Sequence, residues 1–195
     1  YNYGWNRYED EGKEYADGYY REHHRQDEYY LSATVLYHPL EPLTFSLAQD
    51  GVINKLRNSL PECPFPIRYT SISALNARYQ QDWFTAVASL VHTATSEHVE
   101  QGNAPDNFHR FAPSFSVSLQ PWQEETLFLR LMYKSTFRLP TFNDLYYYRL
   151  GNRDLRPEKA NEYNLGITWS KSGLLFLDYL SMTVDGYYND VTDKI

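Results

Sequence analysis

Apolar and polar residues alternate along most of the chain, which is the pattern of a β-strand with one apolar face. In the clearest stretch, Phe111–Pro121, odd positions carry phenylalanine, proline, valine and leucine, and most even positions carry serine. Tyr69–Gln80 and Trp83–Ser96 are strand-like but mix both kinds on both faces. The clean alternation recurs at Tyr29–His38, Leu43–Ala48, Thr126–Phe137, Glu162–Trp169 and Leu180–Asn189. With a first strand at Tyr1–Tyr8 and a last strand at Leu175–Asn189, the pattern predicts about nine strands.

The predicted links between these strands alternate in length. The short links fall at residues 38–42, 80–82, 121–125 and 171–174. The long links fall at Asp10–Gln26, Lys55–Ile67, Glu97–Arg110 and Arg138–Asn161. Outer-membrane barrels alternate in this way because their periplasmic turns are short and their extracellular loops are long. A soluble β-sandwich gives no reason for such strict alternation.

The residues on the two faces favour the same architecture. The polar face is mostly Ser, Thr, Ala and Gly, which suits a hydrated lumen better than an open surface rich in Lys and Glu. Three tryptophans, Trp83, Trp122 and Trp169, fall beside short links, where an interfacial aromatic belt would lie. The predicted fold is therefore all-β: a meander of consecutive long antiparallel strands that forms part of a large transmembrane β-barrel.

Composition and charge exclude several classes of protein. No apolar run approaches the roughly 18 residues of a membrane-spanning helix, and the mean hydropathy is -0.64. A net charge of -7 without a Lys/Arg run argues against nucleic-acid binding. Cys63 is the single cysteine, so neither a disulfide framework nor a thiolate metal cluster is predicted. The chain has no Gly-x-Ser-x-Gly or His-Glu-x-x-His motif, and we expect neither an enzyme nor a bound cofactor.

The segment after residue 137 combines turn chemistry with flanking strands. Pro140 forces its predecessor into an extended shape, and Thr141 with Asp144 three residues later predicts a capping box at one short helical turn. Gly151-Asn152 supplies a turn, and Pro157 extends the chain into the next strand. We therefore expect a folded loop between two long strands.

This segment resembles the mid-barrel phrase of TonB-dependent receptors, of the form FRxPTxxxLY … GNxxLxPExxxxYxxGI. The matching stretches are Phe137–Tyr147, Gly151–Lys159 and Glu162–Gly166, and Asp185–Ile195 is similar to the strand end that follows in the family. The resemblance implies that the Arg138–Asn161 loop is extracellular and that the protein lies in the outer membrane of a Gram-negative bacterium. It also implies a barrel of about 22 strands that encloses a plug domain.

The family resemblance implies active uptake of a scarce nutrient, with energy from the TonB complex acting through the plug. Siderophore iron, haem, cobalamin and oligosaccharide are the candidate substrates. Residues 1–195 are then expected to be a piece of the barrel, with the plug and the last strands outside this sequence. Two alternatives stay open: a passive, porin-like outer-membrane barrel, and a soluble β-rich binding module.

Two groups of residues are candidate ligand contacts on the loops. Tyr146, Tyr147, Tyr148 and Arg149 lie near the tip of the motif loop, where aromatic rings and an arginine could anchor a flat or sugar-like ligand. His23 and His24 lie in a charged link and could contact haem or a metal. The alternatives are loop packing for the tyrosines and a solvated surface for the histidines.

Arg130, Lys134 and Arg138 share one strand face at intervals of four residues. A charge that points into lipid costs about 2–4 kcal/mol at the bilayer midplane, so this basic ladder is expected to face the lumen. It could meet the plug or an anionic ligand there. It could also pair with acidic residues on adjacent strands, such as Glu162 or Asp185.

Overall fold

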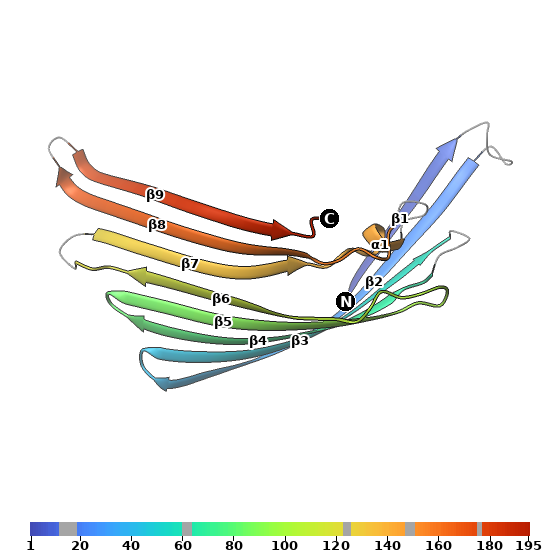
Figure 1. Cartoon of the computed structure of the whole chain (residues 1–195), viewed down its shortest axis with the longest axis horizontal. Coiled ribbons are helices and arrows are strands. Elements are labelled where there is room, and N and C mark those ends of the chain that lie inside the picture. The colour runs from blue at the N-terminus through green and yellow to red at the C-terminus, as the bar shows by residue number, and fades with distance from the viewer. Residues whose placement is uncertain (12–18, 60–63, 123–125, 147–150, 175–176) are drawn as a thin grey trace.

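The computed structural model describes residues 1–11, 19–59, 64–122, 126–146, 151–174 and 177–195. In this part of the chain nine strands form one antiparallel sheet whose spatial order follows the sequence, β1 to β9 (Figure 1). The strands are β1 (Asn2–Glu11), β2 (Tyr19–Leu40), β3 (Leu43–Asn58), β4 (Ile67–Gln81), β5 (Phe84–His98), β6 (Phe108–Leu119), β7 (Thr126–Arg138), β8 (Glu158–Leu174) and β9 (Leu177–Thr192). A short helix, α1 (Phe142–Tyr146), lies between β7 and β8. The predicted all-β meander is confirmed.

Two predicted links are wrong in extent. Residues 171–174, expected as a short link, all lie within β8, which ends at Leu174. The stretch Asp10–Gln26 was expected to be a long link, but β1 continues to Glu11 and β2 begins at Tyr19. His23 and His24 therefore lie within β2, where they pair with Arg7 and Asn6 of β1. The error has a physical cause: strands that continue beyond the apolar band have water on both faces, so their residues need not alternate.

The links have different lengths at the two ends of the sheet. At one end, here called the turn end, residues 41–42 join β2 to β3 and residues 82–83 join β4 to β5. At the other, the loop end, the links span residues 59–66, 99–107 and 139–157. Short links and long links thus lie at opposite ends of the sheet, as predicted, although the predicted bounds are not all correct. Cys63 lies outside the described residues.

Strand register separates the side chains into an apolar face and a polar face, because directly paired residues point to the same side. Val35, Leu47, Leu75 and Leu90 form one row across β2 to β5 on the apolar face. Ser46, Asn76 and Ser89 form a row on the polar face, where Asn76 Nδ2 donates to Ser46 Oγ at 3.0 Å.

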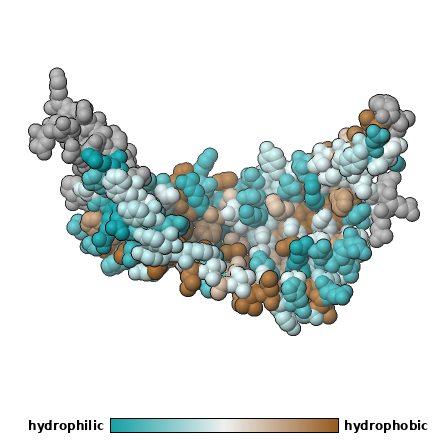
Figure 2. Space-filling model, turned by 180° about the vertical axis from the view of Figure 1, so that it is seen from behind, coloured by the Kyte–Doolittle hydropathy of each residue, from teal (hydrophilic) through white to brown (hydrophobic). Residues whose placement is uncertain are grey.

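No second layer of the described chain covers the apolar face. Leu47, Leu75, Leu131 and Leu165 are each at least half exposed, at 55%, 52%, 50% and 57%. Figure 2 shows a bent slab with apolar residues at the surface among polar ones. A soluble sandwich would bury these leucines against another sheet, so the arrangement is that of a barrel wall.

Aromatic residues lie at the turn end, as the sequence predicts. Trp83 and Trp122 are 48% and 60% exposed, and each stands in or beside a link of this end. Within the described residues, no helix has the length and apolar character required to cross a membrane.

Candidate functional site

The helix α1 begins with the capping box that the sequence predicts. The backbone N–H of Thr141 donates to Asp144 Oδ2 at 2.8 Å, and the backbone N–H of Asp144 donates to Thr141 Oγ1 at 3.2 Å. The Thr141 backbone N–H, and then the Thr141 hydroxyl, hold the pKa of the Asp144 carboxyl below its usual range. The link 139–157 therefore starts from a fixed geometry.

A buried ion pair attaches α1 to the polar face of the sheet. Arg68 on β4 and Glu97 on β5 are direct cross-strand partners, and Arg68 Nε donates to Glu97 Oε1 at 2.6 Å. Their side chains are only 13% and 8% exposed. Arg68 Nη2 also donates to Pro140 O at 2.9 Å, and the guanidinium lies 4.9 Å from the centre of the Phe142 ring. Arg68 thus connects the wall of the sheet to both sides of the α1 N-terminus.

Tyr146, a predicted ligand contact, binds the same carboxylate. Its hydroxyl donates to Glu97 Oε2 at 2.7 Å, and its ring centre lies 6.1 Å from that of Phe142. Burial raises the pKa of Tyr146, and the hydrogen bond to Glu97 raises it further. The hydroxyl therefore has a hydrogen-bond partner within the protein. A role of Tyr146 in ligand binding stays a prediction. The other members of this predicted group, Tyr147, Tyr148 and Arg149, lie outside the described residues.

A second arginine joins the link 139–157 to the link 99–107. Arg153 Nη1 donates to Asn103 O at 3.1 Å, and the guanidinium lies 5.5 Å from the centre of the Tyr146 ring. Gly102 has a φ of +82°, and a β-carbon there would collide with the Arg153 guanidinium. The Arg153 side chain could shift to relieve such a collision, whereas the positive φ favours glycine at this position.

A cleft of about 940 Å³ lies between the two links and the adjoining ends of β4 and β5. Its charged lining residues are Arg68, Arg153, Arg156, Glu97, Asp106 and Asp154. Tyr146 is not among the residues that line it. The mixture of cations, carboxylates and backbone groups can form hydrogen bonds to a polar ligand of considerable size. This cleft is the candidate ligand-binding site.

The basic ladder has an ionic partner two strands away. Arg130 Nη2 lies 3.1 Å from Asp185 Oδ1, and both side chains are 45% exposed. Register places Gly166 of β8 directly between Arg130 of β7 and Asp185 of β9. A β-carbon on Gly166 would collide with the Asp185 carboxylate, so the ion pair passes over the space that this glycine leaves.

The other two ladder residues lie nearer the loop end. Lys134 is paired in register with Glu162, and Arg138 Nη2 lies 3.7 Å from Asp144 Oδ2. Acidic residues thus lie beside the ladder, as expected if its role is to pair with acidic neighbours. Contact with a plug or an anionic ligand stays a prediction.

The two predicted histidines lie apart from the cleft lining. The His23 backbone N–H donates to Ser59 Oγ at 2.9 Å, and its ring stacks on Trp5 with centroids 5.9 Å apart. Among the described residues, no three His, Cys, Asp or Glu side chains are grouped to hold a metal ion. A haem or metal contact by His23 or His24 is untested.

Comparison with known proteins decides the family. A family model described as "TonB dependent receptor-like, beta-barrel" matches residues 1–195. The chain belongs to this family. No curated protein matches the receptor chain significantly.

Two solved structures match this receptor chain. The hemophore receptor HasR of Serratia marcescens, solved as a double mutant with its hemophore HasA and heme, has a TM-score of 0.64 and 15% identity, over 88% of this chain and 33% of that one. FauA, the alcaligin outer-membrane receptor of Bordetella pertussis, has a TM-score of 0.47 and 12% identity, over 88% of this chain and 30% of that one. The receptor chain thus spans about a third of the solved structures, and the likeness to HasR shows the fold alone.

The sequence pattern did not identify the residues whose side chains join the receptor's strands to its loop-end links. Arg68, Glu97 and Arg153 were not singled out, although Arg68 and Glu97 adjoin the two strands whose faces were blurred. The available signal was one charge on the polar face of each strand, close to a long link. Register decides whether such charges meet, and the sequence did not supply it.

Proposed function

We propose that the chain is part of the barrel of an outer-membrane receptor that takes up a scarce nutrient with energy from TonB. The observation that carries the proposal is the exposed apolar face, which no second layer covers in the described part of the chain. Lipid tails are the solvent that such a face suits. The match of the family model over residues 1–195 supports the transport role.

The proposed route begins at the loop end. Ligand binds the outer loops, including the cleft beside α1, and the outer surface of a plug domain enclosed by the barrel. TonB, driven by the inner-membrane proton gradient, acts on the plug, and the ligand passes through the lumen. In this scheme Arg130, Lys134 and Arg138 line the lumen and face the plug.

The substrate class follows from size and polarity. A cleft of about 940 Å³ with charges of both signs suits a bulky polar molecule better than a simple ion. Siderophore iron, haem, cobalamin and oligosaccharide are the candidates. The heme in the HasR structure is a ligand of that protein, and haem is one of the compounds to test here.

The test is growth of a deletion strain on each candidate as the limiting nutrient, with the full-length gene restored or absent. We expect one nutrient to require the gene, and its uptake to stop when TonB is removed or the proton gradient is dissipated. Uptake that survives both treatments would identify a passive, porin-like barrel. Recovery of the intact protein in solution without detergent would identify a soluble binding module.

A further inference from the structure

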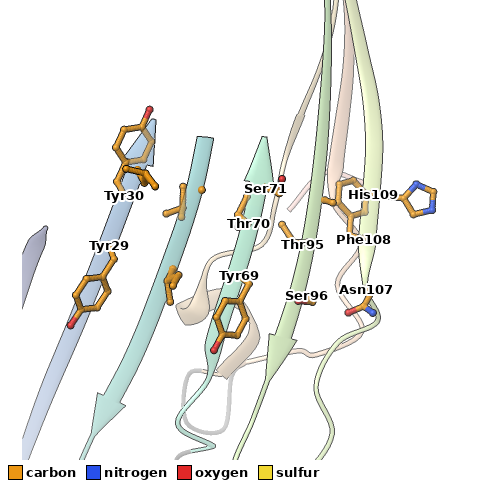
Figure 3. Close-up of a pocket in the computed structure, with 15 residues that line it drawn as sticks. Tyr29, Tyr30, Tyr69, Thr70, Ser71, Thr95, Ser96, Asn107, Phe108 and His109 are labelled. Carbon is orange, nitrogen blue, oxygen red and sulfur yellow. The ribbon is translucent and has the colours of Figure 1, made fainter. Parts of the chain in front are cut away.

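An apolar groove crosses β2 to β6 near the loop end (Figure 3). Its volume is about 680 Å³. Register places most of its lining residues in two rows on the apolar face: Tyr29, Ile53, Tyr69 and Ser96 form one, and Leu31, Gly51, Ser71, Ala94 and His109 form the other. Both rows are opposite to the face that carries Arg68 and Glu97, so the groove lies outside the lumen.

Small residues form the middle of one row of the groove. Gly51, Ser71 and Ala94 are consecutive cross-strand partners, with Leu31 at one end of the row and His109 at the other. A β-carbon on Gly51 would meet nothing within 4 Å. Tyr29 and Tyr69, 45% and 48% exposed, border the groove toward the loop end.

Cations follow immediately beyond these tyrosines on the same face. Lys55 Nζ lies 5.5 Å from the centre of the Tyr29 ring. One step further, Arg25 of β2 and Arg57 of β3 are direct cross-strand partners. Like charges in such positions repel each other unless anions lie between or beside them.

The nearby carboxylate neutralises only part of this charge. Asp27 is buried at 7% exposure, and its Oδ2 lies 3.1 Å from Arg25 Nε. Asp27 is also the direct cross-strand partner of Lys55, whose Nζ lies over the Tyr29 ring. No ion pair to Arg57 is found within the described residues, so one carboxylate lies among three cations. The surface thus carries excess positive charge beside an aromatic border and an apolar groove.

We infer that this surface binds a lipid of the outer leaflet that carries phosphate on its headgroup, with an acyl chain in the groove and the phosphate between Arg25, Lys55 and Arg57. The inference rests on the proposed placement in the outer membrane. The order of the features supports this occupant: apolar groove, then interfacial tyrosines, then cations, along the direction from membrane to water. Guanidinium groups bind phosphate with paired, charge-assisted hydrogen bonds.

The test uses the full-length protein in detergent and measures lipid binding by native mass spectrometry. The probes are lipid A with its two phosphates and the same lipid after the phosphates are removed. We expect wild type to bind the phosphorylated form at least about tenfold more tightly. Equal affinity for the two forms would overturn the inference. So would displacement by millimolar inorganic phosphate, since the site would then bind phosphate without a lipid.

A charge variant and a matched control separate this surface from general electrostatics. The combined change Arg25→Gln, Lys55→Gln and Arg57→Gln should abolish the preference for phosphate. The control changes Arg130, Lys134 and Arg138 to Gln, removing the same three charges from the polar face, and should keep the preference. Loss in both variants, or in neither, would contradict the inference.

A groove variant tests the acyl chain without changing charge. Gly51→Leu should lower affinity for both forms of the lipid, whereas Gly186→Leu, on the apolar face of β9, should not. If the charge variant fails to fold, as judged by its heat-dependent migration on a gel, Lys55→Gln and Gly51→Leu carry the test. Membrane fractionation and nutrient uptake are measured separately, so failure of lipid binding is distinguishable from failure of the proposed function.

Discussion

The two ends of the sheet solve different problems with the same strands. At the turn end, residues 41–42 and 82–83 reverse the chain, and Trp83 and Trp122 remain largely exposed. At the loop end the link 139–157 folds back onto the polar face, and Arg68 and Glu97 are buried there with their hydrogen bonds formed. At the turn end, the protein therefore leaves large aromatic side chains uncovered. At the loop end, the protein buries its own polar side chains.

The contrast shows where single substitutions should matter. Breaking a buried pair leaves an uncompensated charge, whereas changing an exposed side chain on the same strand leaves water to replace the contact. Four substitutions test whether buried contacts matter more than exposed ones, and they follow in order of expected effect.

The largest effect is expected from Arg68→Met. It leaves the Glu97 carboxylate buried without its cation, which costs about 3–5 kcal/mol. Opening of residues 139–146 and 151–157 should increase accordingly in hydrogen–deuterium exchange of the full-length protein. Arg78→Met is the matched control, because Arg78 is exposed on the same face of β4 at the turn end. Equal protection in the two variants would show that the ion pair does not hold the loop.

The second change is Tyr146→Phe. It removes one hydrogen bond to the Glu97 carboxylate, worth about 1.5–3 kcal/mol, and keeps the ring contacts with Phe142 and Arg153. The same exchange experiment should show weaker protection of α1, but less loss than in Arg68→Met. A larger loss than Arg68→Met causes would contradict the order proposed here.

The third change, Asp144→Asn, weakens the capping box and should cost about 1 kcal/mol. Because folding lowers the pKa of Asp144, its contribution is present at neutral pH. This contribution to stability should be lost as the pH falls below 3.8, the ordinary pKa of aspartate, and then through the lower pKa of Asp144 in the folded protein. Protection of α1 should therefore fall with acid more steeply in wild type than in Asp144→Asn. If protection of α1 falls equally with acid in both proteins, the carboxylate of Asp144 does not stabilise the helix.

The smallest effect is expected from Asp185→Asn. The Arg130–Asp185 pair is 45% exposed on both sides, so its loss should cost about 0.2–1 kcal/mol. Denaturant unfolding of the full-length protein should detect the loss at low salt and not at about 1 M salt. Asp190→Asn, on the other face of β9, is the control. An effect that persists at high salt would indicate a role beyond the ion pair.

The alternation of residue types predicted the strands because one face of most strands is mainly apolar away from the loop end. It failed at His23 and His24, which lie on β2 at the loop end, where no face needs to be apolar. It blurred at β4 and β5 for a second reason: Ser71 and Ala94 occupy the apolar face at the groove.

The candidate site was predictable only in its local parts. The Thr141–Asp144 capping box follows from spacing of three residues, and the sequence alone predicted it. The contact of Tyr146 with Glu97 joins residues 49 positions apart, and it depends on how the loop folds over the wall. Residue type indicated that Tyr146 could form a contact, but not whether its partner would be ligand or protein.

The glycine beneath the Arg130–Asp185 pair also bears on how the barrel assembles. A slip of β8 by two residues keeps every apolar side chain on its proper side, so alternation cannot prevent it. Such a slip would bring Asn164 or Thr168 beneath the guanidinium in place of Gly166, and the ends of the Arg130 and Asp185 side chains would then have to shift to meet. A residue without a side chain thus distinguishes the correct alignment of three neighbouring strands from its nearest mimics.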